Sequence, residues 1–144
     1  MTVNQIQDEI INEFSLLDGD MEMTVLYIME LGQKLPIMNE GDKTEDNIVK
    51  GCQSKVWLTA KQNDGKVFFS GDSNTAITKG LVSLLIRIFN GQNPETILNT
   101  DLYFMKKIGM ERFIGTQRSN GFASMIKQIK LYAFAFKTQL AEKE

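Results

Sequence analysis

A single cysteine, Cys52, is the residue of this chain with the most evident chemistry. It lies in the stretch "GCQSKVW" at residues 51–57, and the chain contains no histidine. A thiolate is a nucleophile toward carbon and sulfur, so Cys52 could be a reactive site. An unpaired cysteine is also commonly a small buried hydrophobic residue. Its place beside a glycine, just before a predicted strand, favours the functional interpretation without excluding the other.

The other residues exclude several kinds of site. Without histidine and with one cysteine, neither a tetrahedral zinc site nor a Ser-His or Cys-His dyad can form. The glycine-rich patterns of dinucleotide and P-loop sites are absent, and no acidic cluster argues for magnesium. We therefore expect no metal and no cofactor. A net charge of −2 gives no general attraction to nucleic acid or anionic lipid. No apolar run approaches the ~20 residues of a membrane span.

A β-hairpin is predicted directly after the cysteine. From Ser54 the apolar residues alternate with polar ones, "NDG" at 63–65 is a turn signal, and "KVFFSGD" follows. A two-residue turn would place Ala60 opposite Phe69 and Trp57 opposite Asp72. Both apolar sets then lie on one face of the sheet. Trp57 falls on the other face, either covered by elements outside the hairpin or exposed as an interface anchor.

Helical periodicity and end signals predict the remaining elements. The chain reads as one α+β domain over residues 1–144, and the segment 36–50 as a long acidic loop. A very apolar helix that ends near Phe89 should be buried against the sheet. The expected helices are 4–17, about 21–35, a third capped by Ser73 or Asn74, a short one from Pro94, a short one at 101–110, and a last one from Thr116 or Ser119.

The hairpin register suggests an environment for the thiol. Ser54 would lie level with Thr75, at the first turn of the buried helix, which brings Cys52 close to the positive end of that helix. A helix N-terminus lowers the pKa of a nearby thiol, and Lys50 and Lys55 could add to the effect. Asp72 would act against it. A lowered pKa of Cys52 is our hypothesis.

Four blocks of sequence together resemble the SufE family of sulfur-acceptor proteins. They are "ELGQKLP" at 30–36, "GCQSKVW" at 51–57, "GDSNTAITKGL" at 71–81 and "TQRSNGFASMI" at 116–126. The resemblance runs in order from about residue 10 to 140. Each block is weak by itself, but the cysteine block followed at this spacing by the "GDS…KGL" block is specific.

The resemblance implies a fold and a mechanism. The fold is α+β, with a small antiparallel sheet of about three strands and helices mainly on one face. Residues 47–50 would supply the third strand. The thiolate of Cys52 would accept sulfur from the persulfide of a PLP-dependent cysteine desulfurase, SufS-like or CsdA-like, and stimulate that enzyme. It would pass the sulfur to a SufB-type scaffold for iron–sulfur cluster assembly. Such a protein is a carrier and activator rather than an enzyme in its own right.

The resemblance also points to supporting residues. Gly51, Gln53 and Ser54 would hold the cysteine loop. Arg118, with Asp72 and Ser73, would contact the partner. Arg118 could instead be solvated or paired with an acid such as Glu111, and the simplest interpretation of Asp72 is an acid in the first turn of a helix.

Other functions stay open at this stage. The chain could be a non-covalent regulator of a desulfurase, with an incidental cysteine, or a CsdE-like carrier to a different acceptor. A peroxide-sensing thiol would need an external resolving thiol. A lone cysteine, with early acids and no basic leader at the N-terminus, fits a cytoplasmic protein without membrane or nucleic-acid partners.

Overall fold

Two helices joined by a sharp turn form the N-terminal part of the chain. The computed structural model describes residues 1–143. Helix α1 (Val3–Ser15) begins with a capping box between Thr2 and Gln5, and Asp20 caps α2 (Met21–Gln33). The first helix ends earlier than its apolar period predicts. Asp18 and Gly19 both adopt positive φ, of 51° and 72°, and a left-handed pair cannot continue a right-handed helix.

The acidic segment after α2 contains two short 3₁₀ helices, η1 (Glu40–Asp42) and η2 (Glu45–Asn47). It crosses to the sheet, where Ile48 forms an isolated bridge with Trp57 and the Val49 N–H donates to Val56 O at 2.8 Å. This contact occupies the place of the expected third strand. Pairing stops there because Gly51, at φ 96°, turns the chain away from the sheet edge.

The hairpin is formed by β1 (Val56–Asn63) and β2 (Lys66–Ser73). Its register is the predicted one, with Ala60 opposite Phe69 and Trp57 opposite Asp72. Asp64 and Gly65 make the turn with φ of 53° and 76°, the geometry that a two-residue hairpin loop requires. The sheet of the described residues therefore has two strands, not three.

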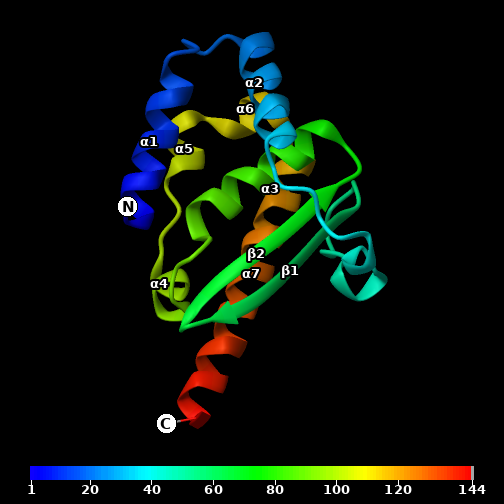
Figure 1. Ribbon diagram of the computed structural model, residues 1–144. Helices are drawn as coiled ribbons and strands as arrows, with labels where there is room; N and C mark the ends of the chain where they lie inside the picture. Colours follow the sequence, from blue (N-terminus) through cyan, green and yellow to red (C-terminus); the bar gives the residue numbers. More distant parts are fainter. Residues whose placement is uncertain (144) are drawn as a thin grey trace.

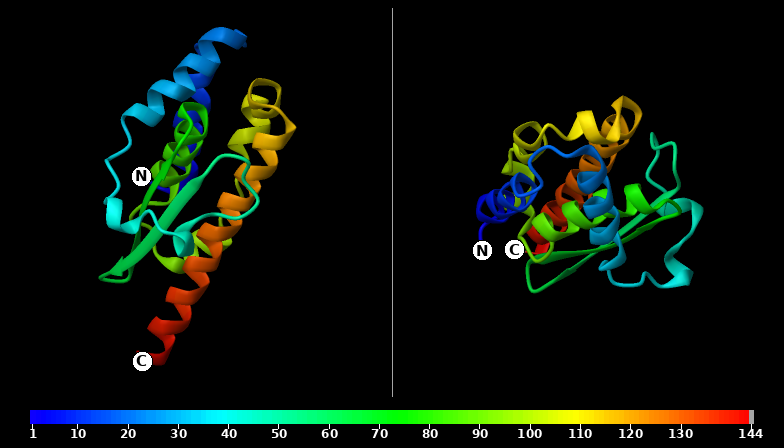
Figure 2. Two further views of the ribbon diagram at one scale, coloured as in Figure 1. Left: turned by 90° about the vertical axis from the view of Figure 1, so that its right-hand side faces the viewer. Right: turned by 90° about the horizontal axis from the view of Figure 1, so that it is seen from above.

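The helices cover one face of this sheet, as Figures 1 and 2 show. Helix α3 (Ala76–Phe89) lies against β2 and is buried along most of its length, as its apolar sequence predicts. Helix α2 crosses the outer side of α3 where two glycines meet. A Cβ on Gly80 would lie 2.0 Å from Ile28 O, so the two backbones are in direct contact.

The C-terminal half consists of short helices followed by one long helix. Asn93 caps α4 (Pro94–Asn99), with Pro94 in the first turn as predicted. The short helix expected at 101–110 is instead two helices, α5 (Phe104–Ile108) and α6 (Met110–Ile114), because Gly109 between them has φ 74°. Helix α7 (Thr116–Lys143) runs behind the sheet, and its C-terminal end projects past the hairpin (Figure 1).

Most of the buried apolar side chains form one cluster, to which the sheet, α3, α7 and the shorter helices all contribute. Phe89, Phe104 and Phe122 are among its largest members, and all three are fully buried. No helix within residues 1–143 is long and apolar enough to cross a membrane.

Candidate functional site

The cysteine lies in a short loop between the Val49 contact and β1. Gly51 precedes it and has φ 96°, a conformation that strains any residue with a side chain. A Cβ at Gly51 would also lie 2.5 Å from Ser124 Oγ of α7. Glycine is therefore required at this position twice over, by the backbone angle and by the approach of the loop to α7.

The thiol of Cys52 points at the long helix. Sγ lies 3.4 Å from the carbonyl oxygen of Gly121, to which it donates a hydrogen bond. Gly121 is buried, and a Cβ on it would lie 3.3 Å from Sγ and 3.6 Å from Cys52 Cα. We call the surface formed by Gly121 and Ser124 the thiol seat, since the cysteine loop rests on these two small residues of α7.

A small cavity adjoins the thiol. Its volume is about 90 Å³ and Cys52 is half-buried at its side. The cavity is lined by side chains from the cysteine loop, from the first two turns of α3 and from the first turns of α7, namely Cys52, Gln53, Ser54, Thr78, Leu81, Gln117, Arg118 and Met125, together with Gly121. The predicted proximity of Cys52 to the start of the buried helix is therefore confirmed.

The hypothesis of a lowered thiol pKa is wrong for this conformation. Burial raises the pKa of Cys52 above its ordinary value, because removing water disfavours the thiolate. The hydrogen bond to Gly121 acts in the same sense, since a carbonyl oxygen can accept a hydrogen bond from the thiol but cannot donate one to the thiolate. Both effects favour the protonated thiol over the thiolate in this conformation.

Two of the three predicted loop residues have visible contacts with neighbouring elements. Gly51 meets the thiol seat as described above. Ser54 Oγ receives hydrogen bonds from Thr75 Oγ1 at 3.0 Å and from Thr78 Oγ1 at 3.5 Å, which ties the loop to the start of α3. Gln53 is exposed and lines the cavity.

Arg118 lies in the first turn of α7, on the wall of the same cavity. Its Nη1 donates to Ile114 O at 3.3 Å, and no carboxylate pairs with it among residues 1–143. Glu111, the acid considered from the sequence, instead accepts from Thr116 Oγ1 at 3.0 Å. Among the residues that line the cavity, Arg118 is the one with a cationic side chain.

Asp72 and Ser73 lie at the end of β2 and do not line this cavity. Asp72 is not an acid of a helix first turn, because α3 begins at Ala76. Its carboxylate binds Lys43 at 2.7 Å and Lys79 at 3.4 Å. Burial acts to raise the pKa of Asp72, but the hydrogen bonds from Lys43 and from the Ser73 N–H and the charge of Lys79 outweigh it, so the pKa is lowered.

Lys43 also helps to cover the side chain of Trp57. Its Nζ lies 5.7 Å from the centre of the Trp57 ring, a cation–π contact, and Ile48 pairs with Trp57 from the same segment. Trp57 is half-buried beneath residues outside the hairpin, the first of the two alternatives drawn from the sequence. The acidic segment is thus fastened to the outer face of the sheet.

Sequence reasoning missed Gly121, Ser124 and Gln117 as parts of the site. The sequence does not indicate what a glycine inside a helix packs against. Gly121 contacts the thiol only because the cysteine loop crosses α7 at this residue. The one available signal was the pair of small residues spaced three apart on the helix, which lie on one side of it.

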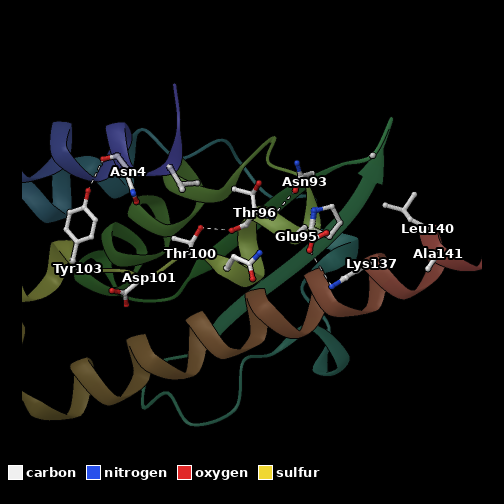
Figure 3. Close-up of a pocket in the computed structure, with 14 residues that line it drawn as sticks. Asn4, Asn93, Glu95, Thr96, Thr100, Asp101, Tyr103, Lys137, Leu140 and Ala141 are labelled. Carbon is white, nitrogen blue, oxygen red and sulfur yellow. Dashed lines mark hydrogen bonds and ion pairs between the residues drawn. The ribbon is translucent and has the colours of Figure 1, made fainter.

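A more voluminous hollow lies elsewhere. It has a volume of about 950 Å³ and lies between α4, the start of α1 and the end of α7 (Figure 3). It shares no residue with the cysteine cavity, and many of its polar groups are already bound to one another. Tyr103 Oη donates to Asn4 O at 3.1 Å, and Thr100 Oγ1 donates to Thr96 O at 2.6 Å. Within residues 1–143, no group of three acidic, histidine or cysteine side chains could hold a metal.

The sequence of this chain matches a known protein family. Residues 8–133 match the family model described as SufE, the Fe-S metabolism associated domain. An uncharacterised SufE-like protein of Rhizobium meliloti (strain 1021) is 40% identical over 128 residues, which cover 85% of this chain and 91% of the relative.

A solved structure shares the fold. The solution structure of a hypothetical protein from Thermus thermophilus superimposes with a TM-score of 0.75 at 21% identity, covering 92% of this chain and 96% of the other. Given the family match over most of the chain and the 40% identical relative, this chain belongs to the SufE family, whose domain is associated with iron–sulfur metabolism.

Proposed function

We propose that this single-domain protein is a sulfur carrier that accepts sulfur on Cys52 from the persulfide of a PLP-dependent cysteine desulfurase. The supporting observation is a free thiol that is half-buried beside a small cavity, on a loop whose neighbours are Arg118 and the start of α3. Family membership supplies the link to iron–sulfur metabolism. The proposal places the protein in the cytoplasm, where an unpaired cysteine stays reduced.

The transfer step needs only this sulfur and its partner. The Cys52 thiolate attacks the outer sulfur of the desulfurase persulfide, a new S–S bond forms, and the donor S–S bond breaks. The electron pair of the broken bond leaves with the desulfurase cysteine as its thiolate. No oxidant or reductant is consumed, and the step requires no histidine, of which the chain has none.

For this reaction the Cys52 thiol must move away from the thiol seat and toward the partner. In the structure Sγ faces Gly121 O with its proton in place, whereas attack on sulfur requires the thiolate. The positive φ of Gly51 and the exposed backbone around it allow the loop to swing outward at the partner. The same movement would present a loaded persulfide to a SufB-type scaffold or, in a CsdE-like role, to another acceptor.

Arg118, Asp72 and Ser73 are the proposed contacts to the desulfurase. Arg118 is exposed beside the cysteine loop and has no acidic partner among residues 1–143, so its charge is available to a carboxylate of the partner. Asp72 already holds two lysines, and Ser73 Oγ donates to Lys55 O at 2.8 Å. These two residues would therefore act by shaping the surface that carries the cysteine loop.

The proposal is tested by intact mass after incubation with a desulfurase and cysteine. The wild-type chain should gain one sulfur, about 32 Da, and release it to a reducing thiol by exchange at sulfur. Peptide mapping should place the gain on Cys52. A Cys52→Ser chain should gain nothing and should no longer stimulate the desulfurase. If Cys52→Ser retains full stimulation, the protein is a non-covalent regulator and the carrier proposal fails.

A further inference from the structure

The contact between the cysteine loop and α7 depends on the absence of a side chain at Gly121. A single added methyl group would place a carbon 3.3 Å from Sγ, and 3.6 and 3.7 Å from Cα and Cβ of Cys52. Carbon and sulfur at 3.3 Å are closer than ordinary contact, so Sγ would have to move away from α7 by a few tenths of an ångström, which lengthens its hydrogen bond to Gly121 O. Glycine is nevertheless unfavourable inside a helix, by about 0.5–1 kcal/mol relative to alanine. The α7 helix thus gives up stability at the point where the thiol rests.

The carbonyl group of Gly121 makes the contact selective for one state of the sulfur. It lies 3.4 Å from Sγ and can only accept a hydrogen bond. The protonated thiol satisfies it, whereas a thiolate would face the negative end of the carbonyl dipole. The cavity wall formed by α3 contributes Thr78 and Leu81, which do not titrate, and α7 contributes Arg118 as its charged group. Lys50 and Lys55 of the cysteine's own segment are exposed.

We propose that Gly121 is a positioning residue that holds the empty carrier in the retracted state, through a hydrogen bond that exists only while Cys52 carries its proton. Loss of that proton to solvent removes the bond and frees the loop. In a persulfide the outer sulfur bears the proton in place of Sγ, so the loaded side chain cannot donate the Sγ hydrogen bond to Gly121 O. The statement about the loaded state rests on the proposed carrier function; the statement about the thiol does not.

The test is the alkylation rate of Cys52 by iodoacetamide in the free protein, as a function of pH. Gly121→Ala and Gly121→Val form a graded series, and Ala123→Val puts the same branched side chain on an exposed position of the same helix. The rate at neutral pH should rise in both Gly121 variants and most in the valine variant. Loss of one ordinary hydrogen bond corresponds to a change of about fivefold. The pH midpoint should move down toward about 8.5, the value of an unperturbed thiol.

Circular dichroism identifies the folded variants, and if Gly121→Val does not fold, Gly121→Ala decides the result. The proposal is overturned if the folded Gly121 variants alkylate at the wild-type rate with the wild-type midpoint, or if Ala123→Val changes as much as they do. Sulfur loading measured by mass on the same variants separates the two proposals. If the Gly121 variants alkylate faster than the wild type but neither they nor the wild type gain sulfur, the carrier function is refuted and the role of Gly121 stands.

Discussion

The sulfur of Cys52 lies 3.4 Å from the carbonyl oxygen of Gly121, although 69 residues separate the two in the chain. This contact defines the state of the free protein. It brings the only thiol against the long helix, beside a cavity of about 90 Å³, where burial raises the pKa of Cys52. In this position the sulfur is half-buried, and its hydrogen bond to Gly121 favours the thiol over the thiolate.

The raised pKa of Cys52 predicts an unusual pH dependence for its reactivity. Alkylation of the folded chain should have a midpoint above about 8.5, the value of a free thiol. The chain unfolded in urea should alkylate with an ordinary midpoint. Because the folded state holds the proton more tightly, this group supports folding below the unfolded pKa and loses that contribution as pH rises through the folded pKa. A folded midpoint at or below the unfolded one would contradict the structure.

Lys43 attaches the acidic segment 36–50 to the sheet, so replacing it should loosen this segment locally. The Lys43→Gln change removes the ion pair with Asp72 at 2.7 Å and the charge over Trp57. Hydrogen exchange at the Val49 amide, which bonds to Val56 O, should become about fivefold faster, the ratio for loss of one ordinary interaction.

The matched control for this experiment is Glu40→Gln. It removes the other ion pair of Lys43, at 2.9 Å, but leaves the contact with Asp72 in place. Glu40 is highly exposed, so the change should have almost no effect on the exchange rate. Equal rates in the Lys43→Gln chain and the wild type would show that the segment is held to the sheet by other means.

The crossing of α2 and α3 predicts a severe effect of one methyl group. In Gly80→Ala the new carbon would lie 2.0 Å from Ile28 O, a backbone atom that cannot swing aside. The free energy of unfolding, measured by urea denaturation, should fall by more than about 3 kcal/mol because the two helices must separate. Gly41→Ala, whose new carbon meets only Asn39 Oδ1 at 3.5 Å, should stay within about 0.5 kcal/mol of the wild type.

The ion pairs that join α1 to α3 predict part of the acid denaturation. Arg87 Nη1 donates to Glu13 Oε1 at 2.9 Å, and this hydrogen bond lowers the pKa of Glu13. Its contribution to stability is present above the unfolded value of about 4.3 and is lost as pH falls through the lower folded pKa. Glu13→Gln should therefore cost about 1 kcal/mol at pH 7 and less at pH 2–3. A loss that is the same at both pH values would contradict this account.

Local patterns in the sequence were sufficient for the elements next to the site. The alternation after Ser54 and the turn at 63–65 predicted the hairpin and its register, because a one-residue slip would expose the whole apolar face. The spacing of the cysteine and "GDS…KGL" blocks indicated the family. These features depend on residues close together in the chain, where backbone geometry limits the alternatives.

The environment of the cysteine was decided by the tertiary structure. Proximity to the start of α3 was predicted, and the pKa was expected to be lowered, yet burial against α7 raises it. Three contacts here join segments that are not adjacent in the chain. They are the packing of the cysteine loop on Gly121, the ion pair between Lys43 and Asp72, and the bridge between Ile48 and Trp57 in place of a third strand. The sequence by itself singled out the Cys52 sulfur as the candidate nucleophile. Packing of distant segments determined its protonation and access, because desolvation depends on every neighbour in space rather than on neighbours along the chain.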